Sequence, residues 1–251
     1  MIATFVRQVI DEQRAFWRNR AGSLFACAFP LVMLAIFGKA LEGIAVGEAN
    51  LDVADYVVPG LATFAIMSTS FFHVAGITIV HRDSGHLRRI RATPRGSAFT
   101  IAGLVGSACL TVSVIVPLIL LEGAWLFGTR TPSSWLGFLL VVAVAVPSLC
   151  ACGFALTSCM PNTIAAQALL TGIFYPVAFL SGTFLPMDNL GWAGDAMKAL
   201  PTTALVSTVI AQFDPTRPAS LGAGLAVIAA WGVAMSLVAF RWFRWEPRAV
   251  A

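Results

Sequence analysis

Charged side chains are scarce in this chain of 251 residues. Asp, Glu, Lys and Arg make up 11% of it, whereas a soluble domain carries about 25%. So little charge excludes a water-facing surface around a folded soluble domain. The hydrophobic content of 58% also excludes a disordered chain, because disorder requires few apolar residues. The chain therefore belongs in a lipid bilayer.

Motifs that carry chemistry are also missing. A phosphate-binding loop needs Gly-Lys followed by Ser or Thr, but the single Gly-Lys pair, Gly38-Lys39, is followed by Ala40. The five cysteines form no C-x-x-C pair, and the three histidines lack metal-ligand spacing. We therefore expect a chain that is not an enzyme and has no catalytic residue, metal or cofactor of its own.

Long apolar runs make up most of the sequence. A transmembrane helix needs roughly 20 apolar residues, and six runs approach or exceed that length. We predict an all-α integral membrane protein with spans at about 22–41, 56–80, 99–127, 134–160, 164–184 and 221–243. The small residues Gly103, Gly106 and Ser107 should let another helix approach the third span closely.

Two segments outside the spans are predicted to lie at the membrane interface. Residues 1–20 alternate apolar and polar side chains at helical spacing, which predicts an amphipathic helix lying in the membrane interface ahead of a transmembrane domain at 21–251. In this helix Gln8 falls on the polar face, with Arg7, Arg14 and Arg18. The outer segment 185–220 is too long for a turn, and its semi-apolar part predicts short re-entrant or interfacial helices.

The basic residues fix the expected orientation. With the N-terminus in the cytoplasm, 12 of the 16 Lys and Arg residues fall on the cytoplasmic side and 4 outside. This split obeys the positive-inside rule, and an even number of spans places both termini in the cytoplasm. Arginines in these segments also suit contact with anionic lipid.

The most polar cytoplasmic loop covers residues 81–96. Ser84 can cap a short helix there, and Pro94 can end it. Leu87 and Ile90 would give this helix an apolar edge beside a basic face. The residues alone leave two interpretations open, a docking element for a soluble partner and a plain positive-inside loop.

Four stretches together resemble the membrane subunit of ABC-2 type transporters, the class that includes daunorubicin-resistance-type drug exporters and polysaccharide export permeases. The first is the amphipathic helix leading into Phe29-Pro30-Leu31, and the second is Tyr56-Val57-Val58-Pro59-Gly60. The third runs from Gly85 to Pro94 and resembles the family's G-x-L-(x)-R-x-x-x-T-P pattern. The fourth is Ser181-Gly182-Thr183-Phe184-Leu185-Pro186, followed by an outer segment that ends at Leu200-Pro201.

The resemblance implies partners and a coupling site. Such subunits pair as homodimers or heterodimers and bind two cytoplasmic ATPase subunits, which hold the ATP and Mg²⁺. Loop 81–96 would match the family's coupling helix. The residues expected at the ATPase surface are Arg82, Asp83, Leu87, Arg88, Arg89, Ile90 and Arg91. Substrate would pass between the two membrane subunits, along faces of the second and fifth spans.

Several side chains within the spans are candidates for the translocation path. An apolar wall on the second span would consist of Phe64, Met67, Phe71 and Phe72. His73 either makes an interhelical hydrogen bond or faces the path. Glu122 is either an interfacial carboxylate paired with Arg130 or a contact for a cationic substrate.

We expect an ATP-driven exporter subunit in the bacterial cytoplasmic (inner) membrane, taking a hydrophobic or amphiphilic substrate such as a drug, antibiotic or lipid, with no nucleic acid partner. The first alternative is a polysaccharide or lipid-linked glycan export permease. The second is a proton-coupled secondary transporter, which would depend on His73 and Glu122, although such carriers usually contain more intramembrane acids. The third alternative is an intramembrane enzyme, which is disfavoured because the sequence contains no catalytic constellation.

Overall fold

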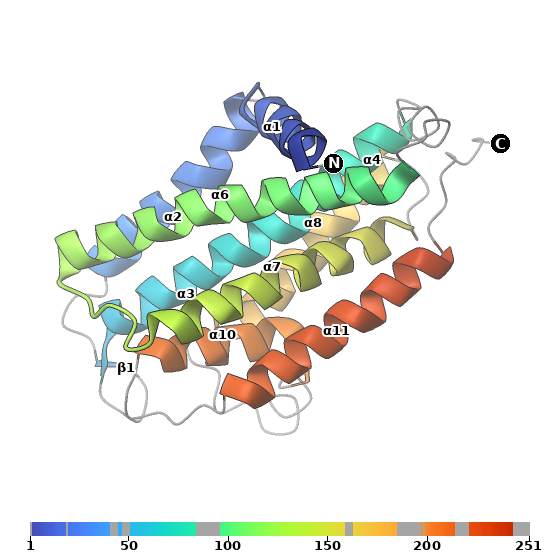
Figure 1. The fold of residues 1–251 in the computed structure, drawn as a ribbon. Coiled ribbons are helices and arrows are strands. Elements are labelled where there is room, and N and C mark those ends of the chain that lie inside the picture. The colour runs from blue at the N-terminus through green and yellow to red at the C-terminus, as the bar shows by residue number, and fades with distance from the viewer. Residues whose placement is uncertain are drawn as a thin grey trace.

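The computed structural model describes residues 2–18, 20–40, 45–46, 51–83, 96–158, 163–184, 197, 199–213 and 221–242. Nearly all of this part of the chain is helical (Figure 1). In chain order its elements are α1 (Ile2–Arg18), α2 (Arg20–Ala40), β1 (Ala45–Val46), β2 (Leu51–Asp52), α3 (Val53–Ser68), the π-helix η1 (Thr69–His73), α4 (Val74–Asp83), α6 (Gly96–Phe127), α7 (Trp135–Ser158), α8 (Thr163–Leu180), α10 (Pro201–Phe213) and α11 (Leu221–Trp242).

Four of the described helical stretches are long and apolar enough to cross a membrane. They are Asp55–Ile79, Phe99–Phe127, Trp135–Ser158 and Leu221–Arg241. Two further apolar stretches, Cys27–Ala40 and Ala168–Leu180, are shorter. The prediction of several apolar membrane helices is confirmed for four spans, and the count of six stays a prediction.

The outward faces of these helices suit a lipid environment. On α6, large apolar residues recur every three or four positions and are exposed: Leu110, Val114, Leu118, Leu121 and Trp125. Trp125 is 86% exposed near the end of α6, and Phe240 is 91% exposed near the end of α11. An apolar stripe this long would be costly in water, whereas aromatic rings near helix ends fit the interfacial belts of membrane proteins.

The bundle has two ends (Figure 1). At the hairpin end, β1 pairs with β2, α3 begins and α6 ends. The α4 end is where α4 finishes, α6 begins and α11 finishes. Helices α3, α6, α7 and α11 run lengthwise between these ends, while α10 is short and lies near the hairpin end.

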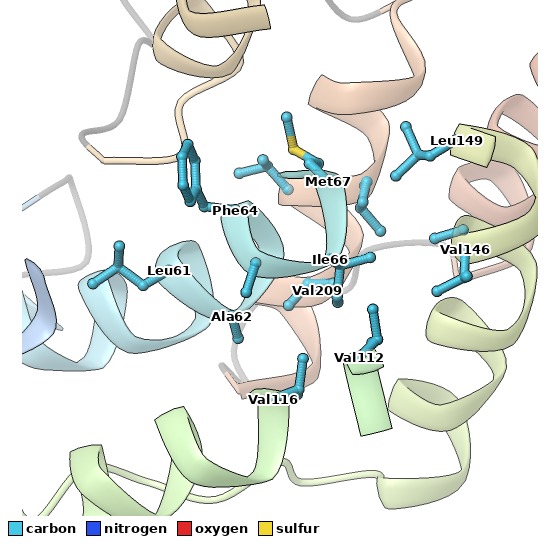
Figure 2. Close-up of a cluster of buried hydrophobic side chains, with 14 of the residues drawn as sticks. Leu61, Ala62, Phe64, Ile66, Met67, Val112, Val116, Val146, Leu149 and Val209 are labelled. Carbon is cyan, nitrogen blue, oxygen red and sulfur yellow. The ribbon is translucent and has the colours of Figure 1, made fainter. Parts of the chain in front are cut away.

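Helix α3 lies at the centre of the core (Figure 2). One face of α3, with Ala62 and Ile66, meets Val112 and Val116 of α6. Val146 and Leu149 of α7 and Val209 of α10 close the same cluster. All of these residues are buried, so α3 is held by several neighbours at once.

Helix α1 packs against the first half of α6, where the sequence predicts a close approach. Gly103 faces Gln8, and a Cβ at Gly106 would come within 2.9 Å of Val9 Cγ2. Gln13 Nε2 donates hydrogen bonds to the Ser107 carbonyl oxygen at 2.6 Å and to Thr111 Oγ1 at 2.8 Å. The predicted close approach at the small residues is therefore confirmed, and the helix that uses it is α1.

The expected faces of α1 need correction. Gln8 lies partly buried against α6 rather than on the arginine face, and Glu12 beside it is only 6% exposed. Gln8 Nε2 donates a hydrogen bond to Glu12 Oε1 at 2.9 Å. Burial raises the pKa of the Glu12 carboxyl, and the hydrogen bond from Gln8 opposes that rise. The contact of α1 with α6 is therefore partly polar, since Gln13 also donates hydrogen bonds to α6 in it.

Three further features depart from the expected helices. The connection between α2 and α3 contains the antiparallel pairs Ala45–Asp52 and Val46–Leu51, a small β-hairpin in a chain predicted to be all-α. The second span contains the π-helix η1, whose extra residue per turn leaves no mark in the apolar pattern. The fifth span ends as a helix at Leu180 rather than at 184, because Gly182 adopts φ +78° and its N–H bonds back to the Phe179 carbonyl.

Candidate functional site

Aromatic rings from α2, α3, η1, α8 and the turn after α8 meet along one side of α3. We call this group the aromatic seam, and it comprises Phe29, Phe64, Phe71, Phe72, Phe174, Tyr175 and Phe184. Phe174 of α8 is its centre, with ring centroids 5.6 Å from Phe64, 5.8 Å from Phe71 and 4.5 Å from Phe72. The seam therefore joins the second apolar run to the fifth.

The candidate wall residues differ in how far they are covered. Figure 2 shows Phe64 and Met67 projecting from the face of α3 opposite the one that meets α6. Phe64 is 2% exposed and Met67 0%, so both lie inside the packed chain. Phe71 and Phe72 are half-buried and continue the same group of rings towards the α4 end. A molecule outside the chain could touch these last two rings, whereas Phe64 and Met67 are covered in this conformation.

The π-helix adds polar groups beside the seam. Thr69 Oγ1 and Ser70 Oγ are buried, and neither has a hydrogen-bond partner within the described part of the chain. Single π-turns inside α-helices occur frequently at functional sites. His73 is the last residue of η1, and its side chain lies outside the described residues.

A second cluster ties α3 to the turn after α8. We call it the three-helix junction, and it consists of Tyr56, Gly60, Ser181, Gly182, Thr183 and Thr202. Tyr56 is 5% exposed, and its hydroxyl donates a 2.5 Å hydrogen bond to the Gly182 carbonyl oxygen. One helical turn further on, a Cβ at Gly60 would collide with the Thr183 carbonyl oxygen. Tyr56 and Gly60, one helical turn apart on α3, thus contact the neighbouring carbonyl groups of Gly182 and Thr183.

The other side of the junction leads into α10. Ser181 Oγ hydrogen-bonds Thr202 Oγ1 at 2.7 Å, which links the end of α8 to the first turn of α10. Trp231 Nε1 of α11 donates to the Ala199 carbonyl oxygen at 2.7 Å, just before α10 begins. Since Trp231 lies in the middle of α11, α10 begins at the level of the middle of that helix.

The far end of α10 reaches the hairpin end. The Gln212 carbonyl oxygen accepts hydrogen bonds from the Ser133 backbone N–H at 2.7 Å and from Ser133 Oγ at 2.6 Å, just before α7 begins. Phe213 packs edge-on against Phe138, with centroids 5.9 Å apart. Helix α10 is therefore a short buried helix that runs from inside the bundle to one of its ends.

A family model described as ABC-2 type transporter matches residues 5–213. The chain belongs to this family. The match begins in α1 and ends at the last residue of α10, so it includes both the aromatic seam and the three-helix junction. No curated protein sequence matches the chain.

As a member of the ABC-2 family, the chain is a membrane component of an ABC transporter. Two of the stretches that carried the resemblance touch one another. Tyr56 and Gly60 belong to the stretch that opens the second span, and Gly182 and Thr183 belong to the stretch that ends the fifth. The junction is thus built from segments 126 residues apart, as measured from Tyr56 to Gly182.

Glu122 of this ABC-2 protein is not the partner of Arg130. The Arg130 Nε atom lies 3.7 Å from Asp55 Oδ2, and the Arg130 backbone N–H donates to Asp55 Oδ1 at 3.2 Å. Arg130 therefore closes the hairpin end onto the first turn of α3. Oε2 of Glu122 is buried and has no hydrogen-bond partner among the described residues.

Most of the expected coupling residues lie outside the described part. Arg82 and Asp83 are the last two residues of α4, at the α4 end of the bundle. Leu87, Arg88, Arg89, Ile90 and Arg91 are not among the described residues. Within the described ranges, no group of three His, Cys, Asp or Glu residues comes together as a possible metal site.

Sequence reasoning missed the centre of the seam and the role of the junction. Phe174 is one of 18 phenylalanines, and nothing in its neighbourhood distinguishes it from a lipid-facing residue. Tyr56 gave a stronger signal, since it is one of two tyrosines and opens an apolar span. A buried tyrosine hydroxyl usually has a hydrogen-bond partner, but the sequence cannot tell which carbonyl group it reaches.

Proposed function

We propose that the chain is the membrane subunit of an ATP-driven exporter for a hydrophobic or amphiphilic substrate, such as a drug, an antibiotic or a lipid. The match to ABC-2 type transporters over residues 5–213 carries this proposal. The chain has no phosphate-binding loop, so a separate subunit would bind ATP and Mg²⁺. A second membrane subunit, identical or related, would complete the path.

In this proposal the α4 end faces the cytoplasm of a bacterial cell. The arginines of α1 and Arg82 lie towards that end, whereas Lys39 and the Asp55–Arg130 pair lie at the hairpin end. The length of α6 supports this placement. Its 32 residues extend about 48 Å, which exceeds a hydrocarbon core of about 30 Å. The excess at its start is where α1 packs, as expected for an interfacial helix.

The aromatic seam supports the proposed substrate class. Phe71, Phe72 and Tyr175 form a partly exposed apolar face between the second and fifth apolar runs. Rings of this kind suit flat apolar molecules, and stacked aromatic pairs contribute about 0.5–1.5 kcal/mol beyond area burial. The orphan hydroxyls of Thr69 and Ser70 would supply a few polar contacts nearby.

Co-purification tests the proposal. The tagged chain, purified in mild detergent from cells that produce it, should carry along an ATPase subunit with a phosphate-binding loop. ATP hydrolysis by that complex should rise on addition of amphiphilic dyes, and the chain alone should hydrolyse none. Purification of the chain as a complete transporter without any ATPase would contradict the proposal.

The coupling loop offers a residue-specific prediction. Leu87→Asp should abolish both ATPase co-purification and export, because an interface hot spot is worth about 2 kcal/mol or more and a buried carboxylate adds a desolvation cost. Leu87→Met is the control and should behave as the wild type. If the loop only directs topology, Leu87→Asp will leave both measurements unchanged, since all its arginines remain.

A further inference from the structure

Helices α3, η1 and α4 form one continuous rod. They follow each other without a gap from Val53 to Asp83 and connect the hairpin end to the α4 end (Figure 1). The rod then leads into stretch 84–95, where the ATPase contact is proposed. A displacement of that stretch along the membrane normal would therefore be felt at the first turns of α3.

The first turns of α3 are attached to the turn after α8 by two contacts of different kinds. One is the hydrogen bond from the buried Tyr56 hydroxyl to the Gly182 carbonyl oxygen. The other is steric, because the Thr183 carbonyl oxygen occupies the space that a side chain at Gly60 would need. Movement of the turn Ser181–Thr183 along α3 would break the Tyr56–Gly182 hydrogen bond or separate Thr183 from Gly60.

The same turn is attached to α10. Gly182, with φ +78°, fixes the direction in which the chain leaves α8. Ser181 hydrogen-bonds the Thr202 hydroxyl in the first turn of α10. The contacts Tyr56–Gly182 and Ser181–Thr202 thus form a short chain from α3 to α10.

We propose that Tyr56 is a positioning residue that transmits movement of the α3–α4 rod to α10 through the turn Ser181–Thr183. The inference rests on the proposed function, because the movement would originate at the ATPase. Helix α10 is buried over most of its surface and emerges at the hairpin end, so a shift of this helix would alter the end of the bundle far from the ATPase. Tyr56 touches no substrate in this account and acts only through the Gly182 carbonyl group.

A probe on α10 tests the inference in the complete complex. In a variant lacking its native cysteines, Ser207→Cys on the exposed side of α10 carries an environment-sensitive fluorophore. The complex with its ATPase is placed in nanodiscs, and emission is compared between the nucleotide-free and the ATP–vanadate-trapped states. Tyr56→Phe removes only the hydroxyl group. Ser113→Ala is the matched control, since it also removes one hydroxyl group, and that group donates to the Cys109 carbonyl oxygen of its own helix α6 at 2.8 Å.

We expect Tyr56→Phe to retain ATP hydrolysis within about twofold of the wild type while the emission change on trapping falls by more than half. Ser113→Ala should keep the full emission change. Thr202→Val, which breaks the next link of the chain, should reproduce the loss and serves as the test if Tyr56→Phe does not yield monodisperse protein.

Two results would overturn the inference alone. They are a wild-type complex that hydrolyses ATP without any emission change, and a Tyr56→Phe or Thr202→Val complex with the full wild-type change. Failure of the chain to co-purify with an ATPase would overturn the proposed function and this inference together.

Discussion

At Glu12, burial and hydrogen bonding act on the same carboxyl group in opposite directions. Burial in the contact between α1 and α6 is the larger effect and raises its pKa, while the hydrogen bond from Gln8 lowers it. The neighbouring Asp11 adds a smaller rise through like charge. The side chain is held because the small residues of α6 let α1 lie close, so an acid ends up where an apolar residue would be expected.

The raised pKa makes the docking of α1 sensitive to pH. Below the unfolded-state pKa of a glutamate, about 4.3, Glu12 is protonated in both the folded and the unfolded chain. The stability that this group contributes is then fully present. As pH rises through the folded pKa, the buried carboxyl must ionise and stability falls. Glu12→Gln keeps the acceptor for Gln8 and cannot ionise. It should therefore raise the apparent Tm at pH 7.5 by a few degrees, since about 1 kcal/mol shifts the Tm by about 2–4 °C at this size.

The measurement is a thermal scan of purified protein between pH 4.5 and 8. The Tm difference between Glu12→Gln and the wild type should grow as pH rises. Asp11→Asn is the comparison because it removes the same charge from an exposed side chain, whose ion pair with Arg14 spans 3.7 Å. Since Asp11 contributes only a smaller rise to the pKa of Glu12, its Tm difference from the wild type should change less with pH. A difference for Glu12→Gln that stays flat with pH would refute the assignment.

Among the elements, α8 and α10 behave unlike the long spans. Helix α8 stops at Leu180, and α10 starts at Pro201 at the level of the middle of α11. Both helix ends lie inside the bundle, where water is scarce, so their backbone groups need partners from the protein. Tyr56, Ser181 and Thr202 contribute hydroxyl groups at this point, one of them to the Gly182 carbonyl oxygen.

The close contact of α3 with the turn after α8 predicts an asymmetry between two glycines. Gly60→Ala adds a methyl group against the rigid Thr183 carbonyl group and should cost about 1–3 kcal/mol, as overpacking does. Gly172→Ala in α8 meets no atom within 4 Å, and should be neutral or stabilising by up to about 1 kcal/mol. Thermal scans of both variants against the wild type decide the matter, and equal Tm values for the two would contradict the contact.

For the whole molecule, the decisive feature is the grouping of helix ends. The starts of α3, α7 and α11 meet the ends of α2, α6 and α10 at the hairpin end, which the proposal places outside the cell. The exposed apolar stripe of α6 runs lengthwise between the two ends. Such an arrangement crosses a bilayer in only two orientations, and the basic residues favour one of them.

Cysteine labelling tests this orientation. In a cysteine-free variant, Thr131→Cys in the exposed connection between α6 and α7 should react with an impermeant thiol reagent added to intact cells. Arg14→Cys, whose side chain is 75% exposed on α1, should react only after the cells are opened. Labelling of Arg14→Cys in intact cells would reverse the proposed orientation.

Apolar run length was sufficient to predict the four helices that are long enough to cross a membrane, because a bilayer allows few other structures for about 20 apolar residues. Which helix faces contact each other was harder to predict. Phe174 and Phe64 pair across two helices, and single-chain periodicity cannot say which faces meet. The π-helix η1 and the end of α8 at Gly182 depend on local backbone geometry. An uninterrupted apolar run in the sequence does not reveal either of them. The hairpin depends on only two residue pairs, too short a signal to detect.

The contact between α1 and α6 also constrains how the chain is made. Gln13 hydrogen-bonds Thr111, which is 98 residues further along. A ribosome that adds about 5–20 residues per second needs roughly 5–20 s to cover that distance. During this interval the first helix has left the ribosome while its binding groove does not yet exist. The nascent chain must then keep Gln8, Glu12 and Gln13 hydrated at the membrane surface until the third apolar run has been inserted.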